Sequence, residues 1–229
     1  MSKENYIFGM HPVMEAIKEN KDIDKVLIQS DLRGPNVTEL RKMLTDYKVS
    51  FQNLPLGRLN HMCKKPHQGV VAYLSPVEFM PYQEVLAKAY EAGRVPLLLI
   101  RDHISEVGNF GAICRTAECA GVHAVVIPTK GAAQIGPDAI KTSAGALLQL
   151  PICRSMNLTE TLNFLKTSGL KIIACHEKAE LSHTEADLTS PSAIIMGSEE
   201  SGIHIENLAT STDQIRIPLI GHTSSLNVS

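Results

Sequence analysis

The chain has 229 residues, 44% of them hydrophobic, so it can bury at least one full core and form one large or two modest domains. A formal net charge of -2 excludes a protein that holds nucleic acid through a strongly basic overall charge. Five scattered cysteines without a C-x-x-C pair exclude a disulfide framework and a cysteine zinc site. No signal peptide or membrane-spanning stretch is seen, so we expect a cytoplasmic protein with reduced thiols and no metal.

The first third of the chain alternates strand-like and helix-like patterns, which is typical of a small α/β domain. Strands are expected at 6–8, 25–28, 50–51 and 69–74, and helices at 13–18, 37–47 and 56–63. We assign residues 1–76 to this domain. Two prolines, Pro76 and Pro81, flank a polar helix predicted over 82–92, and we interpret residues 77–93 as a linker.

The remaining chain, residues 94–229, has the pattern of a parallel-sheet domain. Buried strands are predicted at 96–100, 124–127, 170–174 and 193–196, separated by helical stretches. These runs are apolar on both faces, which suits strands covered by helices on both sides.

Three strand ends in this second domain lead into polar loops, within residues 101–117, 194–203 and 215–229. In the first, Asn109 is a natural N-cap, and Arg115 falls off the buried face of the helix that follows. Any one of the loops is explained as well by an ordinary cap or turn. Three such loops at one edge of a sheet, however, could converge on a ligand, because ligands favour the carboxyl ends of parallel strands.

In chain order the three segments read N-x-G-A-I-x-R-T-A, G-S-E-x-S-G-I and I-P-x-x-G-x-x-x-S-L-N-V-S. Together they closely resemble the three motifs of the SpoU/TrmH family of RNA ribose methyltransferases, within the SPOUT superfamily. The resemblance implies an α/β fold in which the parallel-sheet domain contains a deep trefoil knot. It also implies S-adenosylmethionine-dependent methylation of a ribose 2′-hydroxyl in RNA, by a homodimer that forms through the catalytic domain and needs no metal.

The first domain also resembles part of this family. Its segments G-x-H-x-V-x-E-A, from Gly9, and H-Q-G-V, from His67, are similar to the small RNA-binding domain of the members that act on ribosomal RNA. The implied substrate is a guanosine of large-subunit ribosomal RNA. Two alternatives stay open: a tRNA ribose methyltransferase, and a non-catalytic RNA-binding or ribosome-assembly factor of the same fold.

The resemblance assigns roles to residues of the three motifs. The family's key polar residue corresponds to Arg115, surrounded by Asn109, Glu199, Ser225 and Asn227, while Gly197, Ile217 and Leu226 would contact the cofactor. An arginine is a poor proton acceptor at neutral pH, because its pKa lies above about 12. We therefore hypothesise that Arg115 stabilises developing alkoxide charge and fixes the adjacent phosphate, rather than acting as the base.

RNA contacts are expected from local cations rather than from net charge. The candidates are Arg41, Lys42, Arg58, Lys64, Lys65 and His67 in the first domain, and Arg101, Lys130 and Lys141 near the catalytic loops. Family members also continue past the third motif into a long apolar helix that closes the cofactor pocket and joins the dimer interface. The sequence ends at Ser229, before such a helix, so we expect weaker cofactor binding and dimerisation and a partly disordered pocket.

Overall fold

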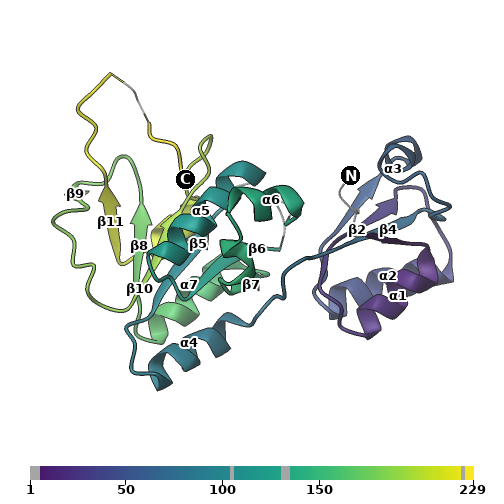
Figure 1. Ribbon diagram of the computed structural model, residues 1–229, viewed down its shortest axis with the longest axis horizontal. Helices are drawn as coiled ribbons and strands as arrows, with labels where there is room; N and C mark the ends of the chain where they lie inside the picture. The colour runs from purple at the N-terminus through teal and green to yellow at the C-terminus, as the bar shows by residue number, and fades with distance from the viewer. Residues whose placement is uncertain (1–5, 104–105, 130–134, 223–224) are drawn as a thin grey trace. The chain divides into compact units, whose positions relative to one another are not determined.

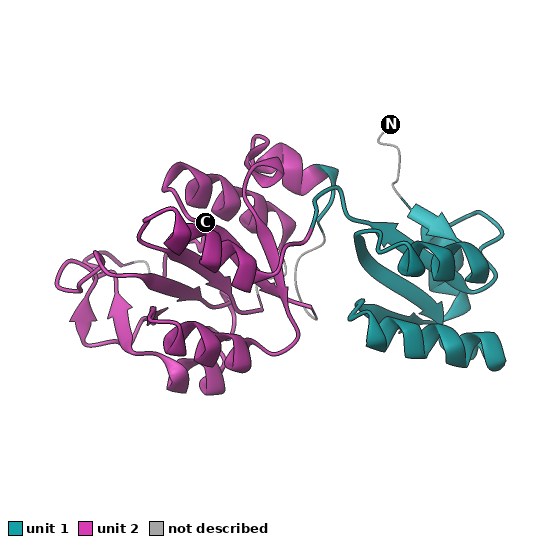
Figure 2. Ribbon diagram, turned by 90° about the horizontal axis from the view of Figure 1, so that it is seen from below, with its two compact units in different colours: residues 1–78, 135–137 teal, residues 79–134, 138–229 magenta. Residues whose placement is uncertain are grey.

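The computed structural model describes residues 6–103, 106–129, 135–222 and 225–229. The chain divides into two compact units, residues 1–78 with 135–137, and residues 79–134 with 138–229 (Figure 2). Each unit has its own sheet and its own core. In the part of the chain that the structure describes, no helix is long and apolar enough to cross a membrane.

The first unit is a four-stranded mixed sheet with helices on both faces. Its strands have the order β1-β4-β2-β3, and only the β2–β3 pair is parallel. Within β2, Val26 and Ile28 pack with helices α1 and α2, whereas Leu27 packs with α3 on the other face, as the two-residue period of a strand requires. The elements are β1 (Tyr6–Phe8), α1 (Met10–Lys18), β2 (Ile23–Gln29), α2 (Pro35–Asp46), β3 (Phe51–Leu54), α3 (Leu56–Met62) and β4 (Val70–Leu74).

The second unit is built on a seven-stranded sheet in which every pair of neighbours is parallel, in the order β7-β6-β5-β10-β8-β11-β9 (Figure 1). The predicted parallel α/β domain is therefore confirmed; the trefoil knot stays a prediction. Its strands are β5 (Leu97–Arg101), β6 (Ala124–Pro128), β7 (Ile152–Ser155), β8 (Lys171–Cys175), β9 (Leu181–Ser182), β10 (Ser192–Met196) and β11 (Asp213–Arg216). The helices are α4 (Tyr82–Glu91), α5 (Val107–Cys119), α6 (Pro137–Thr142), the 3₁₀ turn η1 (Ala146–Leu148), α7 (Leu158–Thr167) and α8 (Ile205–Thr210).

The segment predicted as a linker is instead part of the second unit from Phe79 onward. Phe79 forms a bridge with Ile152 of β7, and the backbone N–H of Met80 donates to the Ile152 carbonyl at 3.0 Å. In α4, Val85 and Leu86 are buried in the core of this unit. The polar face of α4 suggested a solvated connector, but its apolar face is buried as in any surface helix of a globular domain.

Two glycines fix close approaches in the second unit. A Cβ atom on Gly111 of α5 would lie 2.7 Å from the Ala139 carbonyl oxygen, so α5 packs against α6 almost backbone to backbone. A Cβ atom on Gly197 would lie 2.1 Å from the carbonyl carbon of Gly202. Both positions therefore exclude any side chain, and both lie within the motifs singled out in the sequence.

Candidate active site

The three motif loops follow strands of one parallel sheet. Strands β5 and β10 are neighbours, and their last residues, Arg101 and Met196, are directly opposite each other in register. Strand β11 is separated from β10 only by β8. The loops therefore leave the same edge of the sheet, formed by the carboxyl ends of the strands, which is where ligands bind in parallel α/β folds.

The first motif begins with a cap that the sequence analysis assigned to the wrong residue. Helix α5 is capped by Glu106, whose carboxylate accepts the backbone N–H groups of Gly108, at 2.8 Å, and Asn109. Both hydrogen bonds lower the pKa of the Glu106 carboxyl below its ordinary value, and the bond from the Asn109 N–H has the larger effect. Because Glu106 satisfies these two backbone donors, the Asn109 side chain is not needed as the cap and bonds elsewhere.

The second motif meets both of the others at Glu199. The side-chain amide of Asn109 donates to Oε1 of Glu199 at 3.0 Å, and the backbone N–H of Val228 donates to the same oxygen at 3.5 Å. One carboxylate oxygen therefore receives donors from the first and third motifs. The three segments that are distant in sequence converge, as their positions at strand ends suggested.

The loop that carries Glu199 is held in a tight turn. Ser198 and Gly202 exchange two backbone hydrogen bonds of 3.1 and 2.9 Å, and Gly202 has a φ of 68°, in the left-handed region. The Ser198 and Ser201 hydroxyls lie 2.7 Å apart. Gly197 packs directly against Gly202 and so gives this loop, residues 198–202, a defined shape.

One cavity, of about 430 Å³, lies between the second and third motifs. All three residues that the resemblance assigned to the cofactor line it: Gly197, Ile217 and Leu226. Glu199 and Ser225 line it as well. We call it the cofactor cavity.

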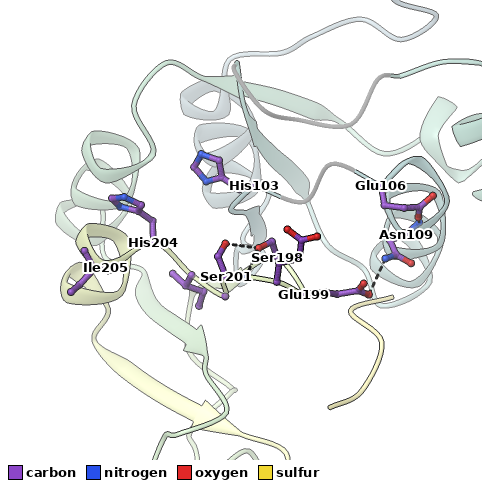
Figure 3. A pocket seen from close by; sticks show the side chains of 11 residues that line it. His103, Glu106, Asn109, Ser198, Glu199, Ser201, His204 and Ile205 are labelled. Carbon is purple, nitrogen blue, oxygen red and sulfur yellow. Dashed lines mark hydrogen bonds between the residues drawn. The ribbon is translucent and has the colours of Figure 1, made fainter. Parts of the chain in front are cut away.

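A second cavity, of about 700 Å³, lies between the first and second motifs (Figure 3). Figure 3 shows Glu106 and Asn109 on one side, His103 and His204 on the other, and the loop with Glu199 between them. We call it the substrate cavity. Residues 198–203 line both cavities, so this loop is a wall that the two share.

Two of the expected catalytic residues do not line either cavity among the described residues. Arg115 is exposed on α5, six residues beyond Asn109, which is about 9 Å along a helix axis at ~1.5 Å per residue. The side-chain oxygen of Asn227 accepts the backbone N–H and the hydroxyl of Ser229, at 2.8 and 2.6 Å. The structure therefore joins Asn109 to Glu199 by a hydrogen bond and places Ser225 with Glu199 in the cofactor cavity, whereas Arg115 and Asn227 line neither cavity.

The side chains that were predicted to contact RNA differ in their exposure to solvent. Lys42, Arg58, Lys64, Lys65 and Lys141 are exposed, and Lys130 lies outside the described residues. Arg41 is half-buried: its guanidinium donates to the Asn53 side chain at 2.7 Å and lies over the Phe51 ring.

Two of the predicted RNA contacts are wrong, because the side chains are buried. His67 is 5% exposed; its Nδ1 accepts the Gly69 N–H at 3.0 Å, which leaves Nε2 to donate to the Asn60 side chain at 2.8 Å. Arg101 is 1% exposed, with its guanidinium 4.2 Å from the centre of the Phe110 ring. Burial lowers the pKa of Arg101 to about 10, so this residue belongs to the interior rather than to an RNA-binding surface.

The cofactor cavity has one wall that the sequence analysis missed, made of residues 175–178. Cys175 is the last residue of β8, and residues 176–178 follow it; β8 lies between β10 and β11 in the sheet. The sequence predicted this strand from its hydrophobic run, but it does not show the strand order that brings the end of β8 to the site. Among the described residues, no group of three or more histidine, cysteine, aspartate or glutamate side chains is arranged to hold a metal ion.

The comparison with known families agrees with this arrangement. Residues 96–229 match the SpoU rRNA Methylase family, and residues 6–80 match the RNA 2'-O ribose methyltransferase substrate binding family. A relative from Staphylococcus saprophyticus, named as a TrmH family tRNA/rRNA methyltransferase, is 32% identical over 99% of this chain and 91% of its own length.

Solved structures of similar proteins share the fold. An AdoMet-bound rRNA methyltransferase from Sinorhizobium meliloti aligns with a TM-score of 0.59 and 18% identity, over 97% of this chain and 81% of its own. A TrmH-family protein from Porphyromonas gingivalis aligns with a TM-score of 0.56 and 25% identity, over 97% and 84% of the two chains.

The chain therefore belongs to the SpoU/TrmH family of RNA methyltransferases. Its first unit contains most of the region that matches the family's substrate-binding model, and its second unit contains most of the region that matches the methylase model.

Proposed function

We propose that this protein transfers the methyl group of S-adenosylmethionine to a ribose 2′-hydroxyl of RNA, most specifically of a guanosine in large-subunit ribosomal RNA. The observation that carries the proposal is the wall that the cofactor and substrate cavities share. A methyl donor in one cavity and a ribose in the other would meet at residues 198–203, where Glu199 joins all three motifs.

The cofactor cavity fits an S-adenosylmethionine molecule in size and in chemistry. Its volume of about 430 Å³ falls within the range of ~300–1,000 Å³ that is usual for small-molecule sites. Ile217 and Leu226 are 57% and 59% exposed and offer apolar surface to the cofactor. The Glu199 carboxylate places negative charge in a cavity whose ligand carries a positive sulfonium. When bound, the cofactor supplies an electrophilic methyl group.

The residues of this chain would orient the acceptor ribose and stabilise the charge that develops on it. Asn109 and Glu199 hold each other in a fixed geometry at the junction of the cavities, and such positioning is a large part of catalysis in a bimolecular transfer. Arg115 would act electrostatically on the alkoxide and the neighbouring phosphate. Because Arg115 lies outside both cavities of its own chain, we propose that it completes the site within a homodimer formed by the catalytic units.

The first unit would bind the RNA. Lys42, Arg58, Lys64 and Lys65 are exposed, and phosphate contacts through such local cations do not require a basic protein overall. The reaction would take place in the cytoplasm, which agrees with the free state of all five cysteines.

The test is transfer of labelled methyl from S-adenosylmethionine to unmodified ribosomal RNA, with transfer RNA as the competing acceptor. A 2′-O-methylated linkage resists alkaline hydrolysis, so the label should appear in alkali-stable dinucleotides, with guanosine on the 5′ side. Arg115→Ala should lose this transfer while keeping its thermal stability, since the side chain is exposed. The matched control is Lys88→Ala, an exposed cation of the second unit on α4 that is no candidate for RNA binding.

Each outcome has a definite meaning. Label in ribosomal RNA establishes the proposed reaction, and label only in transfer RNA replaces the substrate but keeps the chemistry. Label on a base, released by acid as a methylated purine or pyrimidine, contradicts the ribose as acceptor. RNA binding without any transfer indicates a non-catalytic RNA-binding factor.

A further inference from the structure

Next to the first motif, a fully buried carboxylate holds an exposed imidazole. Asp102, the residue after β5, is 0% exposed, and its Oδ2 accepts the backbone N–H of His204 at 2.7 Å and the side-chain amide of Asn207 at 2.9 Å. Its other oxygen, Oδ1, lies 2.5 Å from Nδ1 of His103. Asn207 is fixed in turn by the Thr159 hydroxyl, which donates to it at 2.8 Å. The carboxylate is therefore held in place from three sides.

The His103 ring projects into the substrate cavity. Its side chain is 56% exposed, and it lines the cavity together with Asn109 and Glu199 (Figure 3). Its backbone has a φ of 57°, a left-handed conformation that costs a non-glycine residue about 1 kcal/mol or more. Strain of this kind persists where the surrounding structure over-determines it, and it is concentrated at functional sites.

We propose that His103 is a catalytic residue that accepts the proton of the ribose 2′-hydroxyl through Nε2. An ionised Asp102 can only accept hydrogen bonds, so Nδ1 of His103 must be the donor, and the neutral ring then carries its lone pair on Nε2. This inference rests on the proposed function, because it names the proton acceptor of that same reaction.

Neither of the other candidates for this role is suitable. An arginine keeps its proton at neutral pH, which excludes Arg115 as an efficient acceptor. Glu199 uses Oε1 to accept donors from Asn109 and Val228, which gives its carboxylate a positioning role between the motifs. Imidazole is the side chain that most readily exchanges protons near neutral pH, and a histidine oriented by a carboxylate is a recurring general base.

The step balances without any further reactant. The O–H bond of the ribose breaks as its oxygen forms a bond to the sulfonium methyl carbon, and the methyl–sulfur bond breaks with its electron pair remaining on sulfur. The proton passes to Nε2 of His103 and then to water. The products are a 2′-O-methyl ribose, S-adenosylhomocysteine and a released proton.

The charged groups around His103 are carboxylates. Asp102 contacts the ring directly, and Glu106, Glu199 and Glu200 line the same cavity. The one other titratable group there is His204, whose ring centre lies 6.4 Å from that of His103. Among the described lining residues, the fixed charges are therefore all negative.

The test uses His103→Gly, which removes the imidazole and relieves the left-handed backbone, so the variant should melt at or above the temperature of the unaltered protein. Single-turnover methyl transfer to RNA, at saturating cofactor and RNA, should fall by about 10²- to 10⁴-fold. Added imidazole should restore part of the rate. Ala144→Gly is the matched control, because Ala144 has the same left-handed backbone, with a φ of 51°, but no imidazole.

The pH profile gives a second readout. The single-turnover rate of the unaltered protein should fall on the acid side as one group takes up a proton, and His103→Gly should lose this acid limb. Transfer by His103→Gly within twofold of the unaltered rate, or an acid limb that persists in the variant, would overturn the inference and leave the methyltransferase proposal intact. No transfer by the unaltered protein would overturn both.

Discussion

The side chains of Asn109 and Glu199, 90 residues apart in sequence, meet through a 3.0 Å hydrogen bond. Asn109 belongs to the helix after β5, and Glu199 belongs to the loop after β10, the strand paired with β5. Because Oε1 of Glu199 also accepts the Val228 N–H, the Asn109–Glu199 contact ties the substrate side of the site to the third motif. These two residues should therefore act as one unit.

A double-mutant cycle tests this coupling. Asn109→Ala and Glu199→Ala should each slow single-turnover methyl transfer by roughly 10- to 100-fold, since a hydrogen bond to a charged group contributes about 1.5–3 kcal/mol. The double variant should be little slower than either single variant, with a coupling energy of about 0.5–3 kcal/mol. Additive losses in the double variant would mean that the two side chains act independently.

Gly197 should be intolerant of any side chain. Gly197→Ala places a methyl group 2.1 Å from the Gly202 carbonyl carbon, so the loop must shift; we expect a loss of about 1–3 kcal/mol in the free energy of unfolding. S-adenosylmethionine binding, measured by titration calorimetry, should weaken at least tenfold. The matched control is Gly57→Ala in α3, where a Cβ atom meets nothing within 4 Å and helix propensity favours alanine by up to about 1 kcal/mol. Unchanged cofactor affinity in Gly197→Ala would contradict the assigned cavity.

Cys175 provides a probe of the cofactor cavity that does not depend on catalysis. Cys175 lines the cavity and is exposed to reagents, while desolvation raises the pKa of its thiol to about 11, so alkylation should accelerate about tenfold per pH unit between pH 7 and 10. S-adenosylmethionine should slow alkylation of Cys175, as measured by peptide mass spectrometry. Cys119, exposed on α5 and outside the lining of this cavity, serves as the internal control. Equal alkylation of Cys175 with and without cofactor would place the ligand elsewhere.

The exposed lysines of the first unit should set the salt dependence of RNA binding. Each phosphate contact that is lost lowers the slope of log K against log salt by about 0.7–0.9, so the double variant Lys64→Ala/Lys65→Ala should lower it by about 1.4–1.8. Lys18→Ala should leave it unchanged, because Lys18 pairs with Glu15 at 3.1 Å on α1 and is no RNA candidate. An unaltered slope in the double variant would exclude this surface.

The sequence predicted most of the strands, because buried strands of a parallel sheet form short apolar runs that need no partner to be recognised. It also predicted that three loops converge, since each follows a strand. It missed β7, whose residues, Ile152–Ser155, include Arg154 and do not form such a run. The order of the strands could not be predicted, because the pairing of two strands leaves no periodic signal in the sequence. For this reason residues 175–178 were not expected at the cofactor cavity.

The errors at individual residues have two physical origins, one local and one tertiary. Asn109 is a favoured capping residue, but the Glu106 carboxylate three positions earlier reaches the same backbone donors. Polar side chains such as His67 and Arg101 are usually exposed, yet each is buried by a partner that only the fold supplies, Asn60 and Phe110. A competing local contact therefore decided the cap, and tertiary contacts decided the burial of His67 and Arg101.

The wall of residues 198–202 between the two cavities has a thermodynamic consequence. A ligand that shifts this loop in one cavity changes the shape of the other, so the occupancies of the two cavities are linked. Linkage is reciprocal: whatever factor S-adenosylmethionine applies to the affinity for RNA, RNA must apply to the affinity for S-adenosylmethionine. If binding in one cavity shifts the turn of residues 198–202, which Gly197 and Gly202 close, each proposed ligand would act as an effector of the other.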